Sequence, residues 1–69
     1  MNVCADMAGK ITEICVTVGA QVLPEQELVI VESMKMQIPI VAPTGGTVKN
    51  ILVTSGQFVN AGDILLELH

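Results

Sequence analysis

Residues 31–40 of the chain read VESMKMQIPI, and the rest of the sequence is organised around this segment. Valine and isoleucine lie towards both of its ends, and these branched residues favour extended strands because they fit a pleated surface. In the middle stands Lys35, flanked by Met34 and Met36. The segment therefore predicts two strands joined by a short turn, with Lys35 at or near the apex.

The two sides of this segment are copies of one pattern, which emerges when the sequence is shifted by 37 residues against itself. Residues 5–32 then align with residues 42–69 without a gap, and eight of the 28 pairs are identical. The identical pairs are Ala5/Ala42, Gly9/Gly46, Ile14/Ile51, Val16/Val53, Thr17/Thr54, Gly19/Gly56, Val22/Val59 and Leu28/Leu65. Two copies predict one domain with quasi-twofold symmetry, because a solenoid needs three or more repeats.

Each copy predicts the same succession of short strands, and no segment has a helical period bounded by capping residues. The apolar residues of the long strand slip once from strict alternation, which predicts a bulge. Gly19 and Gly56 are expected to end the long strands. The predicted ranges are a long strand at 10–18 and 47–54, a short extended piece around Val22 and Val59, and a final strand at 27–33 and 64–68.

About eight short strands in two equivalent sets predict an all-β fold over residues 1–69, which form a single domain. Each set alone leaves an apolar face uncovered, so two sheets must pack face to face. We expect two antiparallel four-stranded sheets with quasi-twofold internal symmetry, that is, a flattened β-barrel or sandwich (a barrel-sandwich hybrid). The link between the copies, residues 33–41, lies opposite the chain termini by symmetry. Lys35 is therefore expected at the far end of the molecule.

The composition limits both the core and the partners. Apolar residues make up 51% of the chain, but Phe58 is the only aromatic residue, so an aliphatic core is expected with Phe58 packed into it. The net charge is −4 and the three lysines are dispersed, which predicts no nucleic-acid partner because such binding needs a basic patch. No apolar run approaches the roughly 18–20 residues of a membrane span. A cytoplasmic protein, monomeric in isolation and without a membrane partner, is expected.

The two cysteines, Cys4 and Cys15, are predicted to be buried or half-buried free thiols. Two cysteines in a chain without a secretory signal do not form a disulfide framework. A structural zinc site needs about four ligands, and the chain has a single histidine, His69. The sequence therefore predicts no metal site.

Three roles are open to Lys35: a solvated turn residue, a catalytic amine, or an acceptor for a covalently attached group. A catalytic lysine needs a depressed pKa, produced by desolvation or a neighbouring cation. An exposed apex with Glu32 nearby supplies neither, and no companion base or nucleophile is evident, so no catalytic residue is predicted. An acceptor lysine needs only an exposed amine on a rigid, protruding tip. A tight hairpin favours Asn-Gly or Asp-Gly, so Met34 and Lys35 indicate a purpose other than turn stability.

At this point the sequence resembles the biotinyl domains, which are the biotin carboxyl carrier domains of biotin-dependent carboxylases. The resemblance covers about residues 3–68 and extends to the free-standing single-domain biotin/lipoyl attachment proteins. The family often has proline where Asp6 stands and glycine where Glu25 stands, and both departures fall in turns away from Lys35. The segments that carry the resemblance are Glu32-Ser33-Met34-Lys35-Met36, Ile38-Pro39-Ile40-Val41-Ala42-Pro43, Met7-Ala8-Gly9-Lys10-Ile11 and residues 56–65.

The resemblance implies a carrier and not an enzyme. Biotin protein ligase would attach biotin to the ε-amine of Lys35. Biotin carboxylase would then load the biotin with CO2, and a carboxyltransferase would pass the carboxyl group to an acyl-CoA or an oxo acid. Met34 and Met36 match the flanking methionines that shape recognition and transfer, and Glu32 matches an acidic position upstream.

Two alternatives to a biotin carrier stay open. A lipoyl domain of a 2-oxo acid dehydrogenase or glycine-cleavage system resembles the biotinyl domain in fold, but its lysine usually stands in Asp-Lys-Ala or a related triplet. Met-Lys-Met therefore favours biotin over lipoate. The other alternative is a β-sandwich interaction module in which Lys35 is never modified.

Overall fold

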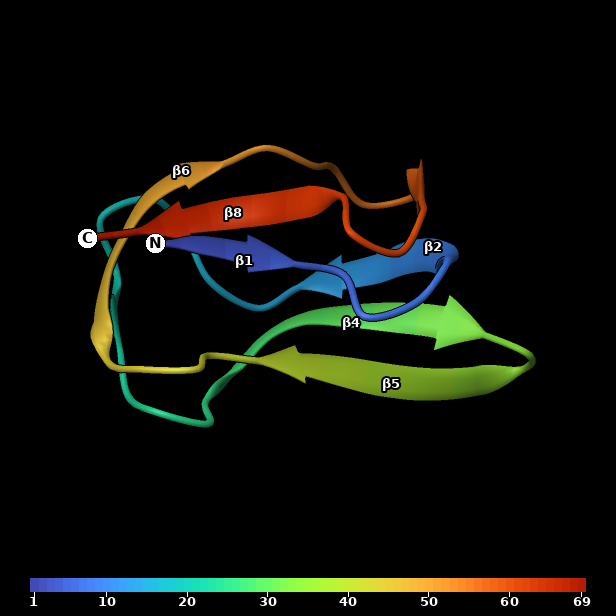
Figure 1. Ribbon diagram of the computed structural model, residues 1–69, viewed down its shortest axis with the longest axis horizontal. Helices are drawn as coiled ribbons and strands as arrows, with labels where there is room; N and C mark the ends of the chain where they lie inside the picture. Colours follow the sequence, from blue (N-terminus) through green and yellow to red (C-terminus); the bar gives the residue numbers. More distant parts are fainter.

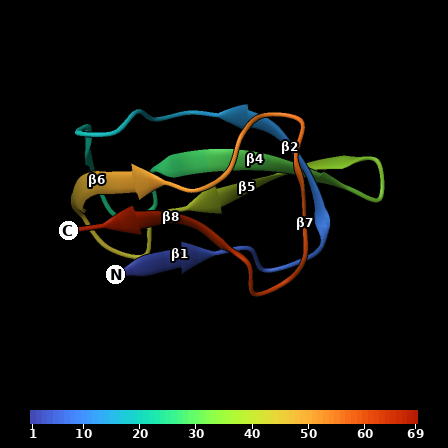
Figure 2. The same cartoon turned by 90° about the horizontal axis from the view of Figure 1, so that it is seen from above.

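The computed structural model describes all 69 residues as eight β-strands without a helix. The strands are β1 (Asn2–Cys4), β2 (Gly9–Ile14), β3 (Gln21–Val22), β4 (Glu27–Ser33), β5 (Met36–Val41), β6 (Gly46–Ile51), β7 (Phe58–Val59) and β8 (Ile64–Leu68). They form two antiparallel four-stranded sheets that lie over one another in a flattened body of 30 × 19 × 18 Å (Figures 1 and 2). The structure contains no helix that could cross a membrane. The predicted fold class is confirmed.

The quasi-twofold symmetry is visible in the order of the strands. One sheet has the order β1-β8-β6-β3 and the other the order β5-β4-β2-β7. Replacing each strand by its equivalent in the other half, β1 by β5 through β4 by β8, converts the first order into the second. Each sheet therefore contains strands of both halves, so neither half can bury its apolar face without the other.

The predicted bulges occur at equivalent places in the two long strands. The pairing of β2 with β4 shifts register between Ile11 and Glu13, so Thr12 has no partner opposite. The pairing of β6 with β8 shifts in the same way around Lys49, which stands 37 positions after Thr12. The slip in apolar alternation was therefore a reliable sign of a bulge.

The lengths of the strands agree with the sequence only in part. The final strands, β4 and β8, have the predicted bounds. The long strands were predicted too long, because β2 ends at Ile14 and β6 at Ile51. Gly19 and Gly56 lie further along in turns, where their φ angles of 91° and 93° suit glycine.

The core is aliphatic throughout, and it contains no buried polar or charged side chain. Sixteen buried residues form one cluster, to which both halves contribute. Leu28 and Leu65 are equivalent in the repeat, and both are fully buried. Burying one such side chain contributes about 1.5–3 kcal/mol to folding, so the paired positions stabilise the two halves together.

Three side chains that were expected inside the molecule lie on its surface. Phe58 is 65% exposed because it points outward from the two-residue strand β7, while Val59 points into the core. Cys4 and Cys15 are free and exposed. Cys4 alternates with buried Val3 along β1, so the period of the strand turns it outward. The predictions of buried positions for these residues were wrong.

Candidate functional site

The candidate site is the hairpin of β4 and β5. The two strands pair from Glu27 opposite Val41 to Ser33 opposite Met36. Met34 and Lys35 are therefore left as a two-residue turn. In Figure 1 this turn lies at one end of the long axis, and both chain termini lie at the other. Lys35 thus occupies the apex that the repeat predicted.

The turn itself is strained. Met34 and Lys35 have φ angles of 53° and 64°, both in the left-handed region. A tight hairpin requires positive φ at its two central residues, which is why Asn-Gly is favoured there. Each non-glycine residue in this region costs about 1–2 kcal/mol. The β4–β5 ladder therefore closes a turn whose own residues oppose it, and such strain is characteristic of functional positions.

The side chains at the tip are open to solvent. Met34 is 91% exposed and Met36 is 60% exposed. Lys35 is also exposed, and its ammonium group takes part in none of the side-chain hydrogen bonds of the molecule. A large enzyme can therefore reach the amine without displacing any part of the fold.

Glu32 lies just below the tip, on the outer face of the hairpin sheet. It is exposed, and it stands in register between Lys10 on β2 and Gln37 on β5. The structure thus gathers all four predicted site residues at one end of the molecule, with Glu32 on the flank and Met34, Lys35 and Met36 at the apex. The register also places Lys10 and Gln37 on this flank.

The hairpin is supported just below its tip by a close approach of β2 to β4. A Cβ atom on Gly9 would lie 2.5 Å from the carbonyl oxygen of Glu32 and 2.6 Å from Cγ1 of Val31. Glycine at this position lets the two strands pack closely beneath the tip. Nothing in the local sequence of the hairpin indicated this support, because Gly9 is 23 positions before Glu32.

Thr12 is a further residue that the sequence did not single out. Its hydroxyl lies on the bulge of β2, and Oγ1 donates a hydrogen bond of 2.9 Å to Oε1 of Gln37. The same oxygen lies 3.2 Å from the carbonyl oxygen of Ile30, so the two acceptors share the single hydroxyl proton. A side chain on β2 therefore reaches β5, two strands away, one residue beyond Met36.

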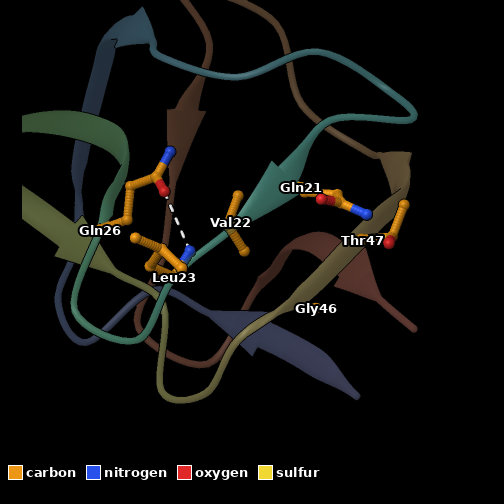
Figure 3. Close-up of a pocket in the computed structure, with 6 residues that line it drawn as sticks. All are labelled: Gln21, Val22, Leu23, Gln26, Gly46 and Thr47. Carbon is orange, nitrogen blue, oxygen red and sulfur yellow. Dashed lines mark hydrogen bonds between the residues drawn. The ribbon is translucent and has the colours of Figure 1, made fainter.

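Away from the hairpin, the surface has one pocket and no cluster of potential metal ligands. No group of three or more His, Cys, Asp or Glu side chains could hold a metal ion. The single pocket has a volume of about 490 Å³ and is lined by the paired strands β3 and β6 and by the turn that follows β3 (Figure 3). One of its walls is the turn in which the amide of Leu23 donates a 2.9 Å hydrogen bond to Oε1 of Gln26. The pocket contains no ionisable side chain; its lining residues are Gln21, Val22, Leu23, Gln26, Gly46 and Thr47.

Known proteins that resemble this chain are either of similar length or longer proteins that contain a similar segment. A biotin/lipoyl attachment protein of Bacillus subtilis is 50% identical over 68 residues, which cover 99% of this chain and 93% of that protein. A biotin carboxyl carrier protein of Streptococcus mutans is 50% identical over 64 residues, covering 93% of this chain and 49% of that protein. Among solved structures, a single-chain, multi-domain long-chain acyl-CoA carboxylase superposes with a TM-score of 0.90 at 38% identity, over 96% of this chain and 6% of that one.

The family model with the description "biotin-requiring enzyme" matches residues 1–68, which is nearly the whole chain. This match covers both repeats and the hairpin between them, and it agrees with the resemblance that the sequence motifs indicated. The chain therefore belongs to the biotin/lipoyl attachment family.

Proposed function

We propose that residues 1–69 form a biotin carboxyl carrier domain and that Lys35 is the residue to which biotin is attached. The observation that carries this proposal is the position of Lys35. It is exposed in a strained two-residue turn, at the end of the molecule opposite the termini. The domain acts as a carrier and has no catalytic residue of its own.

The attachment reaction forms an amide. Biotin protein ligase removes a proton from the ammonium group of Lys35, and the free amine attacks the acyl carbon of biotinyl-adenylate. The new C–N bond forms as the bond to the phosphate oxygen breaks, and AMP leaves. The amide carries no charge, so the formal net charge of the domain changes from −4 to −5.

Once attached, biotin carries a carboxyl group from a biotin carboxylase to a carboxyltransferase. The protein supplies a rigid support for this transfer, since the hydrophobic core contains neither Met34 nor Lys35 of the turn. Exposed Met34 and Met36 offer the partner enzymes an apolar surface on both sides of the attachment point. Glu32 offers a carboxylate on the flank of the hairpin. We expect the domain to be cytoplasmic and monomeric in isolation.

Co-expression of the chain with a biotin protein ligase tests this proposal. The intact mass of the purified protein should increase by one biotinyl group. Lys35→Arg should abolish the increase, whereas Lys10→Arg and Lys49→Arg, which alter the other two lysines, should leave it intact. An unchanged mass in the presence of active ligase would contradict the proposal, as would labelling that survives Lys35→Arg.

The second candidate function is lipoate attachment, because the Bacillus relative is named as a biotin/lipoyl attachment protein. The mass measurement separates the two groups, since a lipoyl ligase would add a lipoyl increment to the same lysine. The Met-Lys-Met triplet favours biotin. We expect lipoyl labelling to be the slower of the two reactions when each ligase is supplied at the same concentration.

A further inference from the structure

The contact between Thr12 and Gln37 joins the hairpin to a strand with which β5 does not pair. β5 is an edge strand and pairs only with β4. Thr12 belongs to β2, on the far side of β4, and lies 25 residues before Gln37 in the chain. Its side chain therefore crosses over β4 on the outer face and holds the outermost strand of the hairpin.

The bulge of β2 is what makes this reach possible. Lys10 and Ile11 pair in register with Glu32 and Val31, but Thr12 has no partner on β4. An unpaired residue at a bulge can aim its side chain along the sheet, because bulges redirect side chains. The hydroxyl of Thr12 contacts the carbonyl oxygen of Ile30 on β4 and the amide oxygen of Gln37 on β5.

The other half of the molecule provides an internal comparison. Lys49 occupies the equivalent bulge in β6. The side chain of Lys49 takes part in no hydrogen bond. The two repeats agree in the backbone at this point and differ in the side chain. The hydroxyl is present only in the repeat whose bulge lies beneath the lysine hairpin.

The hairpin needs such a contact because its tip is poorly supported. The last pairing of β2 with β4 is Lys10 opposite Glu32, so the final pair of the hairpin, Ser33 and Met36, has no partner on β2. The turn that follows is strained at both of its residues. With one edge free and a strained turn at its end, β5 is held near the tip by β4 and by the Thr12–Gln37 hydrogen bond.

We propose that Thr12 is a positioning residue for Lys35, acting through Gln37 to fix the direction in which the hairpin presents the amine. This inference rests on the proposed function, because it concerns how the modifying ligase meets its acceptor lysine. A hairpin that samples several directions offers the ligase only a fraction of competent molecules, and the apparent affinity falls by that fraction. Loss of the contact should therefore raise the KM for the carrier and leave kcat unchanged.

The test compares Thr12→Val, Gln37→Ala, the double variant and Thr12→Ser with the wild type. Val keeps the branched shape and strand preference of Thr but lacks the hydroxyl, and Ser keeps the hydroxyl. Thr12→Val and Gln37→Ala should each raise the KM for biotinylation about 3- to 10-fold, the range that one side-chain hydrogen bond supports. The double variant should be no worse than either single variant. Thr12→Ser should restore the KM to within about twofold of the wild-type value.

Lys49→Val provides the matched control at the equivalent bulge, and it should leave the KM unchanged. Amide hydrogen exchange gives a second measurement that needs no ligase. Thr12→Val should speed exchange at the amides of residues 33–37 and leave the amides of β6 and β8 unaffected. If Thr12 were only a structural residue, Thr12→Val would lower the melting temperature without changing the KM or the local exchange, and the proposal would be wrong.

The two proposals fail in different ways. If the wild-type chain is not labelled by an active ligase, the assignment of Lys35 as the biotin acceptor is overturned. Hydrogen exchange in Thr12→Val still decides whether Thr12 holds the hairpin. If labelling proceeds normally in the wild type and Thr12→Val matches it in KM and in exchange at residues 33–37, the positioning role of Thr12 is overturned and the acceptor role of Lys35 stands.

Discussion

Glu25 and Gly62 occupy the same position in the two repeats, and both have a left-handed backbone, with φ angles of 67° and 93°. Each is the third residue of a turn in which the amide of the fourth residue donates to the carbonyl oxygen of the first, Gln26 to Leu23 and Asp63 to Asn60. A turn with positive φ at its third residue favours glycine. The first repeat therefore has a strained backbone at Glu25, where the second has an unstrained glycine.

Glu25→Gly should accordingly stabilise the protein. We expect the free energy of unfolding to rise by about 0.5–1 kcal/mol, since relief of the left-handed strain outweighs the greater flexibility of glycine in the unfolded chain. The reverse change, Gly62→Glu, should lower the free energy of unfolding by about 1 kcal/mol. Urea titration followed by far-UV circular dichroism measures both, because the chain contains no Trp or Tyr. A loss of stability in Glu25→Gly would show that the side chain contributes more than the strain costs.

Met34→Asn should stabilise the hairpin and impair its function. Asn tolerates the left-handed region better than other non-glycine residues, so the free energy of unfolding should rise by about 0.5–1 kcal/mol. The 91% exposed side chain of Met34 sacrifices little burial in the exchange. Biotinylation should slow, because the ligase loses an apolar contact beside Lys35. Met36→Asn is the matched control: it removes the other methionine but lies in β5, where Asn is unfavourable, so it should bring no gain in stability.

Gly9→Ala and Gly46→Ala should differ in cost, although the two glycines are equivalent in the repeat. A Cβ on Gly9 would lie 2.5 Å from the carbonyl oxygen of Glu32, inside the sheet, whereas one on Gly46 would lie 2.5 Å from that of His69, the last residue. The carbonyl oxygen of His69 lies past the end of β8 and can shift more easily than that of Glu32, a residue paired on both sides, with Lys10 of β2 and Gln37 of β5. We expect Gly9→Ala to cost about 2–3 kcal/mol of unfolding free energy and Gly46→Ala about half as much. Equal losses in a urea titration would contradict this ordering.

The reactivity of Cys15 should depend on Glu13. Although Cys15 is exposed, partial desolvation of its sulfur raises the pKa of the thiol above its ordinary value. The hydrogen bond that Sγ donates to Oε2 of Glu13, at 3.5 Å, and the charges of Glu13 and Glu27 raise this pKa further. The thiolate is the nucleophile, so Glu13→Gln should speed alkylation of Cys15 by iodoacetamide at pH 8. The rate is followed by mass spectrometry in a Cys4→Ser background. Glu67→Gln, which removes a distant charge, should have no effect.

The same shift has a consequence for stability. Because the pKa of Cys15 is higher in the folded protein than in the unfolded chain, the unfolded chain loses this proton first as the pH rises. The contribution of Cys15 is therefore complete below the ordinary pKa of a thiol and is lost as the pH rises through the folded value. Unfolding free energies measured across this alkaline range should fall more in the wild type than in Glu13→Gln. An identical decline in the two proteins would exclude Glu13 as a cause.

The repeat explains why so much of the fold could be predicted from the sequence. Glycines and aliphatic residues recur in register, so each strand or turn predicted in one repeat could be checked against the equivalent residues of the other repeat. The long strands were overestimated because Val16 and Val53 are buried beyond the ends of β2 and β6. An apolar pattern reports burial, and here burial continues after the ladder of hydrogen bonds has ended.

The candidate site divides in a similar way. The apex position of Lys35 followed from the symmetry of the repeat, because it depends only on the order of the segments. The contact of Thr12 with Gln37 could not be predicted, since it depends on how β2, β4 and β5 align, and a single bulge changes that alignment. The outward direction of Phe58 was missed for a comparable reason: a strand of two residues is too short to show its own alternation.

The ends of the chain are also fixed to each other. The amino group of Met1 donates a 2.8 Å hydrogen bond to the carbonyl oxygen of Leu68, and the amide of Leu68 donates one of 2.8 Å to Met1 in return. Any polypeptide joined at either end would leave from the end of the molecule opposite the turn between β4 and β5 (Figure 1). The hairpin that carries the attached group would then face away from the linker, whether the linker joins the amino or the carboxyl terminus. The same geometry would serve a small independent carrier and a segment of a much longer chain.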